Sequence, residues 1–112
     1  MDFIRTEKNG VVLFQVALSR ATVKEAKDFK DILMEDINLG KQNIVIDFSS
    51  CEFIDSTFLR VIVTSQKKAI ENDGKIKLVA TKPAVESMFE LTRVNKIIHT
   101  FSSIDDALAS FN

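Results

Sequence analysis

Four short apolar runs, each followed by a segment of helical periodicity, constrain the fold of this chain more than any other feature. The runs occupy residues 11–17, 43–48, 75–80 and 96–101, and the last is the weakest of them. Each has the length and the Val, Ile or Phe content of a buried strand. Strands that alternate with helices predict a mostly parallel sheet joined by right-handed crossovers.

A β-hairpin is predicted ahead of this alternation. Residues 2–7 read as a strand, and Lys8-Asn9-Gly10 separates them from the strand at 11–17. Asn-Gly is a strong hairpin signal because both turn positions require positive φ. The fold class is therefore α/β with element order β-β-α-β-α-β-α-β-α. We expect one domain over residues 1–112, with a mixed or mostly parallel sheet of about four or five strands.

Helix boundaries follow from capping residues. Thr22 and Glu25 form a capping box for the first helix, and Gly40 is a plausible end. The second helix is expected to open at Asp55 and to run to about Asn72, with core-facing residues Leu59, Ile62, Val63, Ala69 and Ile70. The third begins near Pro83, with an inner face of Val85, Met88 and Leu91. The fourth is capped from the segment 103–106, with an apolar face of Ile104, Ala107, Leu108 and Phe111.

Charge and hydropathy exclude several classes of partner. Fifteen Lys and Arg against sixteen Asp and Glu give a net charge of −1, so no summed positive field favours direct nucleic-acid binding. No apolar run approaches the roughly 18–20 residues of a membrane span, and no signal-peptide pattern follows Met1. We expect a cytoplasmic protein, in agreement with the single cysteine, Cys51.

Composition also predicts that the chain holds no metal and no cofactor. One cysteine and one histidine, Cys51 and His99, do not make a Cys/His zinc site. The three glycines lie about thirty residues apart, so neither a dinucleotide fingerprint nor a phosphate-binding loop is present. Cys51 is interpreted as a small buried hydrophobe and His99 as a structural residue in a strand.

Ser56 is the residue to which the sequence assigns most functional interest. It lies next to Asp55 where a loop enters the second helix. Both residue types are common helix caps, which is one interpretation. The other is a phosphorylation switch, because a phosphoryl group adds about −1.5 to −2 charges at a helix N-terminus. Arg60, four residues on, lies one helical turn away and can pair with it.

A family resemblance enters at this segment. Residues 44–56 read IVIDFSSCEFIDS, which resembles the central signature of STAS domains, the family of bacterial anti-sigma factor antagonists. The segments 74–79 (GKIKLV), 85–92 (VESMFELT) and 103–108 (SIDDAL) also fit the family pattern. The resemblance covers nearly the whole chain from about Val11.

The resemblance implies a regulatory protein rather than an enzyme, with no catalytic residues of its own. In that family an anti-sigma factor serine kinase phosphorylates the serine after the aspartate, and the phosphorylated antagonist is released. A metal-dependent serine phosphatase restores it. Ser56 is then the phospho-acceptor, with Thr57 a weaker candidate, and Asp55 helps to shape the surface that the kinase contacts.

The chain departs from the family at two positions after this serine. The family commonly has glycines where Phe58 and Arg60 stand, which implies a differently shaped partner surface. The predicted partner-binding set is Asp55, Ser56, Thr57, Phe58 and Arg60. For Phe58 two arrangements stay open: a partly exposed aromatic anchor at the helix edge, or a ring tucked under a neighbouring loop.

Three further hypotheses accompany this one. A STAS-like scaffold or oligomerisation module, including a homodimer, would act without phosphorylation. A hydrolase would use Ser56 with His99, although no nucleophile-elbow motif is present. A receiver-type phospho-acceptor at Asp47 is disfavoured because the chain opens with a hairpin. A dense group of lysines (Lys67, Lys68, Lys75, Lys77 and Lys82) reads as a solvated face, with an acidic partner surface as the alternative.

Overall fold

A five-stranded mixed sheet forms the centre of the computed structural model, which describes residues 1–111. Its strands are β1 (Phe3–Lys8), β2 (Val11–Val16), β4 (Asn43–Asp47), β6 (Lys75–Val79) and β7 (Thr100–Phe101), in the order β1-β2-β4-β6-β7. β1 and β2 pair antiparallel, and all other neighbours pair parallel. The predicted α/β class and N-terminal hairpin are confirmed, and Asn9 and Gly10 have φ of 53° and 79°.

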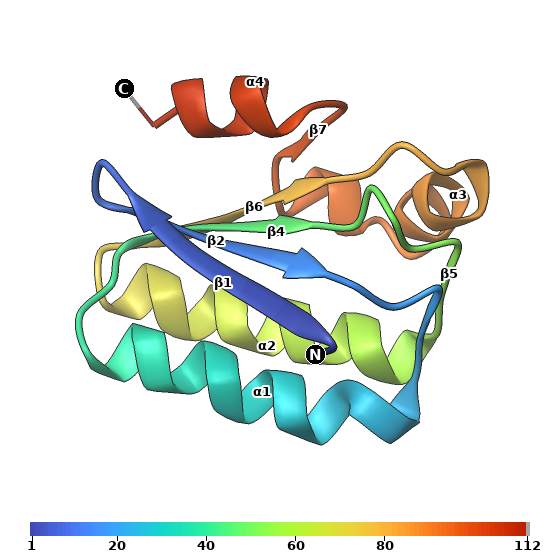
Figure 1. The fold of residues 1–112 in the computed structure, drawn as a ribbon, viewed down its shortest axis with the longest axis horizontal. Coiled ribbons are helices and arrows are strands. Elements are labelled where there is room, and N and C mark those ends of the chain that lie inside the picture. Colours follow the sequence, from blue (N-terminus) through green and yellow to red (C-terminus); the bar gives the residue numbers. More distant parts are fainter. Residues whose placement is uncertain (112) are drawn as a thin grey trace.

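Four α-helices cover the sheet unequally. α1 (Val23–Asn38) and α2 (Ser56–Glu71) lie side by side on one face, whereas the short α4 (Ile104–Ala109) lies on the other, and α3 (Pro83–Leu91) packs near the ends of the strands (Figure 1). The main apolar core fills the space between the sheet and α1 and α2, and a smaller cluster lies beneath α4. The predicted capping box of Thr22 and Glu25 is present.

A second, two-stranded parallel sheet was not predicted. It pairs β3 (Arg20–Ala21) with β5 (Phe53–Ile54), immediately before α1 and α2. Two-residue strands carry too little periodicity to be recognised in a sequence. Their pairing places the N-termini of the two long helices next to each other.

The prediction of a strand over residues 96–101 is wrong in its first half. Val94–Lys96 forms a 3₁₀ turn, and only Thr100–Phe101 pairs with β6. Val94 and Ile98 are buried while Ile97 is 56% exposed, which is the spacing of a helical turn rather than strand alternation. His99 consequently lies outside the strand and is exposed.

Two residues expected in the core are at the surface. Ile70 on α2 is 55% exposed, and Leu91, the last residue of α3, is largely exposed. Phe89 takes the inner position on α3 with Val85. The buried stripe of α2 is also wider than expected, because this helix packs against both α1 and the sheet. Its buried residues are Phe58, Leu59, Ile62, Ser65, Gln66 and Ala69.

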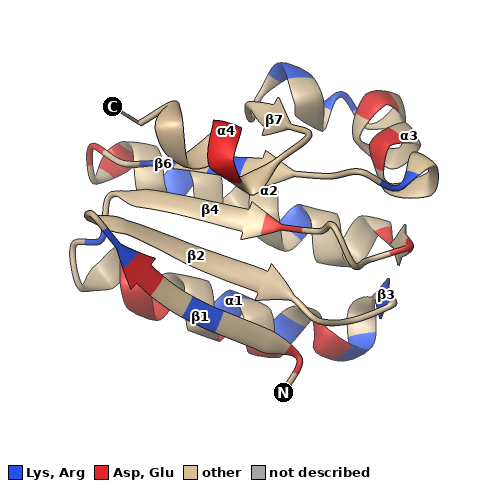
Figure 2. Ribbon diagram, turned by 45° about the horizontal axis from the view of Figure 1, so that its top comes forward, with Lys and Arg blue, Asp and Glu red and all other residues tan. Residues whose placement is uncertain are grey.

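Charged residues of both signs are distributed over the molecule (Figure 2). β1 carries Arg5 and Glu7, α3 carries Glu86 and Glu90, and Lys or Arg residues lie on α2 and between α3 and β7. No helix within residues 1–111 has the length and apolar character needed to cross a bilayer.

Candidate functional site

The candidate site lies at the N-terminus of α2, where Ser56 is the first helical residue and is exposed. Asp55 is the N-cap, and its Oδ1 accepts a hydrogen bond from the backbone N–H of Phe58 at 2.8 Å. Of the two capping candidates in the sequence, the structure therefore uses Asp55. The Ser56 hydroxyl does not serve as the cap and is accessible to a visiting enzyme.

Asp55 has a second structural partner. Its Oδ2 accepts a hydrogen bond from the backbone N–H of Val23 at 2.9 Å, the first residue of α1. Its own backbone N–H donates to the carbonyl of Ala21 at 3.0 Å. Both carboxylate oxygens are thus occupied within the fold. Asp55 therefore holds the N-termini of α1 and α2 together and leaves neither carboxylate oxygen without a hydrogen-bond donor.

The electrostatics around Ser56 suit added negative charge. The N-terminus of a helix carries partial positive charge, and Arg60 stands one turn further along α2. Ser56 and Arg60 line one hollow of about 260 Å³, together with apolar residues of α2 and of the segment after α3. A phosphoryl group on Ser56 therefore has a cationic neighbour on the same surface.

Thr57 is less accessible than Ser56. It is half-buried and lines a separate hollow of about 150 Å³ with Lys30 of α1 and Val61 of α2. Arg60 lines this hollow as well as the one next to Ser56. The two residues thus line different hollows, and Ser56 is the more exposed of the two.

The hypothesis that Phe58 is a partly exposed anchor is wrong. Its side chain is 0% exposed and stacks on Phe29 with ring centroids 5.2 Å apart and planes 8° from parallel. Phe48 meets it edge-on at 6.2 Å. α2 buries both its sheet side and its α1 side, and Phe58 points into the junction of the two. Phe58 therefore belongs to the core and not to the exposed surface around Ser56.

Two other residues considered from the sequence have structural surroundings. Asp47 is buried at the end of β4, where its Oδ1 accepts hydrogen bonds from the backbone N–H and the hydroxyl of Ser49. Cys51 is buried, as predicted, and its burial raises the pKa of the thiol. A raised pKa keeps the thiol protonated near neutral pH, so Cys51 is a poor nucleophile.

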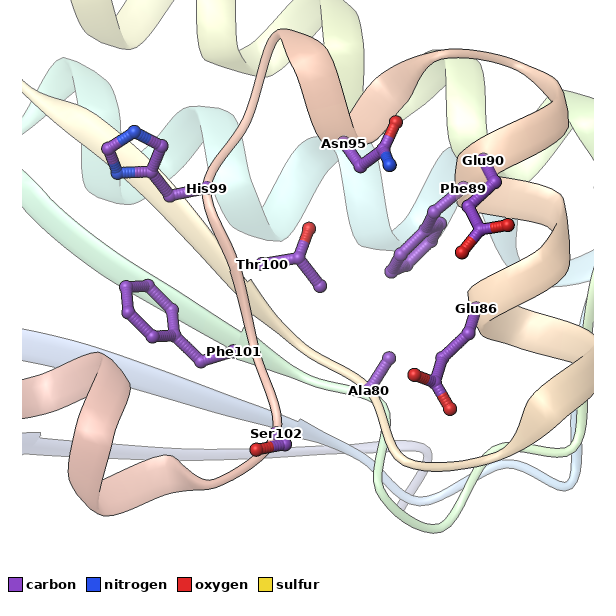
Figure 3. A pocket seen from close by; sticks show the side chains of 9 residues that line it. All are labelled: Ala80, Glu86, Phe89, Glu90, Asn95, His99, Thr100, Phe101 and Ser102. Atoms are coloured by element: carbon purple, nitrogen blue, oxygen red, sulfur yellow. The ribbon is translucent and has the colours of Figure 1, made fainter.

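A larger cavity of about 610 Å³ lies away from Ser56, between α3 and the segment 99–102 (Figure 3). Glu86 and Glu90 of α3 line it opposite His99 and Thr100. Among residues 1–111, no group of three or more His, Cys, Asp or Glu side chains is arranged to hold a metal ion. The residues around this cavity therefore supply no metal centre.

The arrangement of Ser56 and His99 disfavours the hydrolase hypothesis. His99 lines a hollow with Gln66 and Ile70, in the C-terminal half of α2, whereas Ser56 begins the helix. Ten residues of α-helix span about 15 Å, so the imidazole stands far from the hydroxyl it would have to activate.

Sequence analysis missed the apolar residues beside Ser56. Val63 and Ile97 line the same hollow. Val63 also packs against the core, as predicted, whereas Ile97 lies outside the strand expected for it. A signal was available in the sequence, because residues 56, 63 and 70 fall on one face of a helix at steps of two turns. Whether another element covers that face depends on the tertiary structure.

The chain is similar to known proteins in both family and fold. A family model described as "STAS domain" matches residues 4–107. The chain is 30% identical over 87 residues to a Thermotoga maritima protein named "Putative anti-sigma factor antagonist", covering 77% of this chain and 77% of that protein.

Solved structures share the same fold. An anti-sigma factor antagonist from Mycobacterium paratuberculosis superposes with a TM-score of 0.88 at 23% identity, covering 96% of this chain and 91% of that one. The Bacillus cell fate determinant SpoIIAA in its phosphorylated form has a TM-score of 0.76 at 12% identity, covering 98% and 99%.

Proposed function

This chain belongs to the STAS domain family, and on that premise we propose that it is an anti-sigma factor antagonist regulated by phosphorylation of Ser56. In its unphosphorylated form it binds a serine-kinase anti-sigma factor. The kinase transfers the γ-phosphoryl group of ATP to Ser56 Oγ, the hydroxyl proton leaves and ADP is released. A metal-dependent serine phosphatase returns the protein to its binding form by hydrolysis.

The exposure of Ser56 at the first position of α2, with Asp55 acting as the cap, is the observation that carries this proposal. A capping serine would lose its hydrogen bond on modification, and the helix would be destabilised. Because the cap is Asp55, the hydroxyl of Ser56 can be modified while the helix keeps its N-terminal hydrogen bond. The residue is thus suited to reversible modification of a folded protein.

Charge is the means by which the modification would change binding. A phosphoryl group adds about −1.5 to −2 charges near neutral pH. It would pair with Arg60 on the same surface and repel acidic groups of a bound partner. The fold would tolerate this charge at a helix N-terminus, so binding changes without unfolding.

The proposed role is that of a regulatory binding protein inside a bacterial cytoplasm. The chain would be the substrate of a kinase and of a phosphatase rather than an enzyme itself. The names of its relatives support an antagonist of anti-sigma factors. An unphosphorylated scaffold is the alternative, but it could not use Phe58 as an exposed aromatic anchor, because that ring is buried.

Phosphorylation can be tested with purified components. The protein is incubated with ATP and the anti-sigma factor kinases of its own organism, and intact mass is measured. We expect a gain of about 80 Da that is lost in Ser56→Ala and kept in Thr57→Ala. Labelling that persists in Ser56→Ala would refute the assignment of the site.

Binding is tested with the kinase that passes this first assay. Affinity is measured by calorimetry for the unmodified and the phosphorylated protein, in the presence of ADP. The proposal expects the phosphorylated form to bind at least about tenfold more weakly. Equal affinities would show that the modification is not a binding switch.

A further inference from the structure

A groove runs along α2 from Ser56 towards the C-terminal end of the helix. Two hollows, of about 260 Å³ and about 150 Å³, adjoin one another and share Ile97 as a wall. The first begins at Ser56 and the second extends to Ile70. Fourteen helical steps separate these two residues, so the groove is about 20 Å long. That length matches about four turns of a partner helix.

Aliphatic side chains occur along the whole groove, with Gln66 and His99 among them in the second hollow. Val63 is half-buried between the two ends, and Ile70 and Ile97 are 55% and 56% exposed. Residues 56, 63 and 70 lie on one face of α2, while Ile97 faces them from the turn after α3. Aliphatic side chains at this spacing resemble a surface that receives the apolar face of an amphipathic helix.

The charges around the groove are of one sign. Arg60 lines the first hollow. Lys75 and Lys77 border the second, but the Lys77 side chain reaches Ser110 and Phe111 on the α4 face of the sheet, and strand alternation places Lys75 on that same face. Of the described residues, no Asp or Glu lines either hollow. Within residues 1–111 Arg60 forms no ion pair. The head of the groove therefore offers the unneutralised positive charge of Arg60 beside apolar surface.

We propose that this groove receives an acidic amphipathic segment of the regulatory partner, with aliphatic side chains on Val63, Ile70 and Ile97 and a carboxylate on Arg60. The inference rests on the proposed function and specifies the chemistry of its partner. It also explains the direction of the switch. A phosphoryl group on Ser56 would occupy Arg60 at the head of the groove and repel the carboxylates of the segment.

The test uses designed peptides and does not require the natural partner. The probe is a helical peptide of about 15 residues with Leu at every third or fourth position and Glu on its flanks. One control peptide replaces Glu by Lys, and the other replaces Leu by Ala. Binding to the full chain is followed by backbone amide chemical shifts in NMR.

We expect the Leu/Glu peptide to shift amides along α2 and across residues 92–99. Ile97→Asp should weaken its binding at least about tenfold, and Arg60→Gln should weaken it without removing an apolar contact. Leu39→Asp is the matched control, because Leu39 is an exposed aliphatic residue beyond the end of α1. It should bind as the wild type does, and the amide spectra report whether each variant is folded.

Three results would overturn the proposal: equal binding of the Leu/Lys peptide, shifts confined to another surface, or self-association of the wild type that Ile97→Asp abolishes. The last would make a second copy of the chain the occupant. Failure of the proposed function is a separate result. If the Leu/Glu peptide does not bind but kinase binding still depends on Ser56, only the groove proposal is rejected. If the peptide binds but phosphorylation of Ser56 does not change kinase binding, only the phosphorylation switch is rejected.

Discussion

The carboxylate of Asp55 accepts a hydrogen bond from the backbone N–H of Val23 at 2.9 Å and thereby joins the N-termini of the two long helices. The same carboxylate caps α2 through Phe58 N–H. The residue beside the proposed phosphorylation site thus fixes the site to α1. Because Asp55 is held by both helices, Ser56 would present a fixed geometry to the proposed kinase.

Asp55→Ala should lower the free energy of unfolding by about 2 kcal/mol, because it removes a helix cap and a second hydrogen bond, the one from Val23 N–H. Urea unfolding followed by circular dichroism measures the change. Asp105→Ala is the control, since Asp105 is exposed in the first turn of α4 and should cost under about 0.5 kcal/mol. Equal costs for the two variants would contradict the structural role of Asp55.

Ser56→Asp should separate binding from folding. Its free energy of unfolding should stay within about 1 kcal/mol of the wild type, because an exposed carboxylate at a helix N-terminus is tolerated. Affinity for the anti-sigma factor kinase should fall at least about tenfold. Ser87→Asp places the same charge at an exposed position on α3 and should leave affinity unchanged. Calorimetry of both variants against the kinase decides this.

Phe58→Ala should cost about 4 kcal/mol, because it leaves a cavity among Phe29 and Phe48. Phe58→Leu fills more of that space and should cost about half as much. Leu91→Ala, at an exposed position, should cost under about 0.5 kcal/mol. Thermal and urea unfolding measure all three. A cost for Phe58→Ala as small as that for Leu91→Ala would place the ring outside the core.

Removing either partner of the ion pair between Arg5 and Asp36 should destabilise the fold, but by different amounts. Arg5 donates to both carboxylate oxygens of Asp36, at 2.9 and 2.7 Å. The Asp36 side chain is 6% exposed and that of Arg5 is 39% exposed. Arg5→Met strands a buried charge and should cost about 3 kcal/mol, whereas Asp36→Asn leaves an arginine that water can solvate and should cost about 1 kcal/mol. Urea unfolding at low and high salt tests the order of the two costs.

Lys77 predicts a dependence of stability on pH. It is buried on β6, donates to Ser110 Oγ at 2.8 Å and lies 4.2 Å from the Phe111 ring centroid. Burial lowers the pKa of Lys77 from its ordinary 10.5, so between the lowered pKa and 10.5 the unfolded chain binds more protons than the folded one. The contribution of this residue to stability therefore rises with pH across that interval.

The measurement for Lys77 is a difference between two proteins. Free energies of unfolding are compared for the wild type and Lys77→Met from neutral pH to about pH 10. The difference should shift in favour of the wild type as pH rises, since methionine does not titrate. A difference that stays constant or shifts the other way would contradict the effect of burial on the pKa.

Most of the fold could be predicted because its signals are local. The Asn9-Gly10 turn, the capping box of Thr22 and Glu25 and the apolar runs of β2, β4 and β6 each specify their own conformation. The strand predicted over 96–101 is longer than the observed one. The apolar residues of this segment are few, and their spacing fits a helical turn as well as a strand. The β3–β5 pair escaped prediction because two residues carry no periodicity of their own.

The sequence alone determined the order of the hairpin, the longer strands and the helices, the start of α2 at Asp55-Ser56 and the candidate role of Ser56, since these depend on residue types next to each other in the chain. Tertiary structure decided the rest of the site. Phe58 is buried because α1 packs against α2, whereas Val63 is half-buried and Ile70 is exposed because no helix of the described chain covers that side of α2. Burial depends on which elements meet, and that is a property of the packed molecule rather than of any one segment.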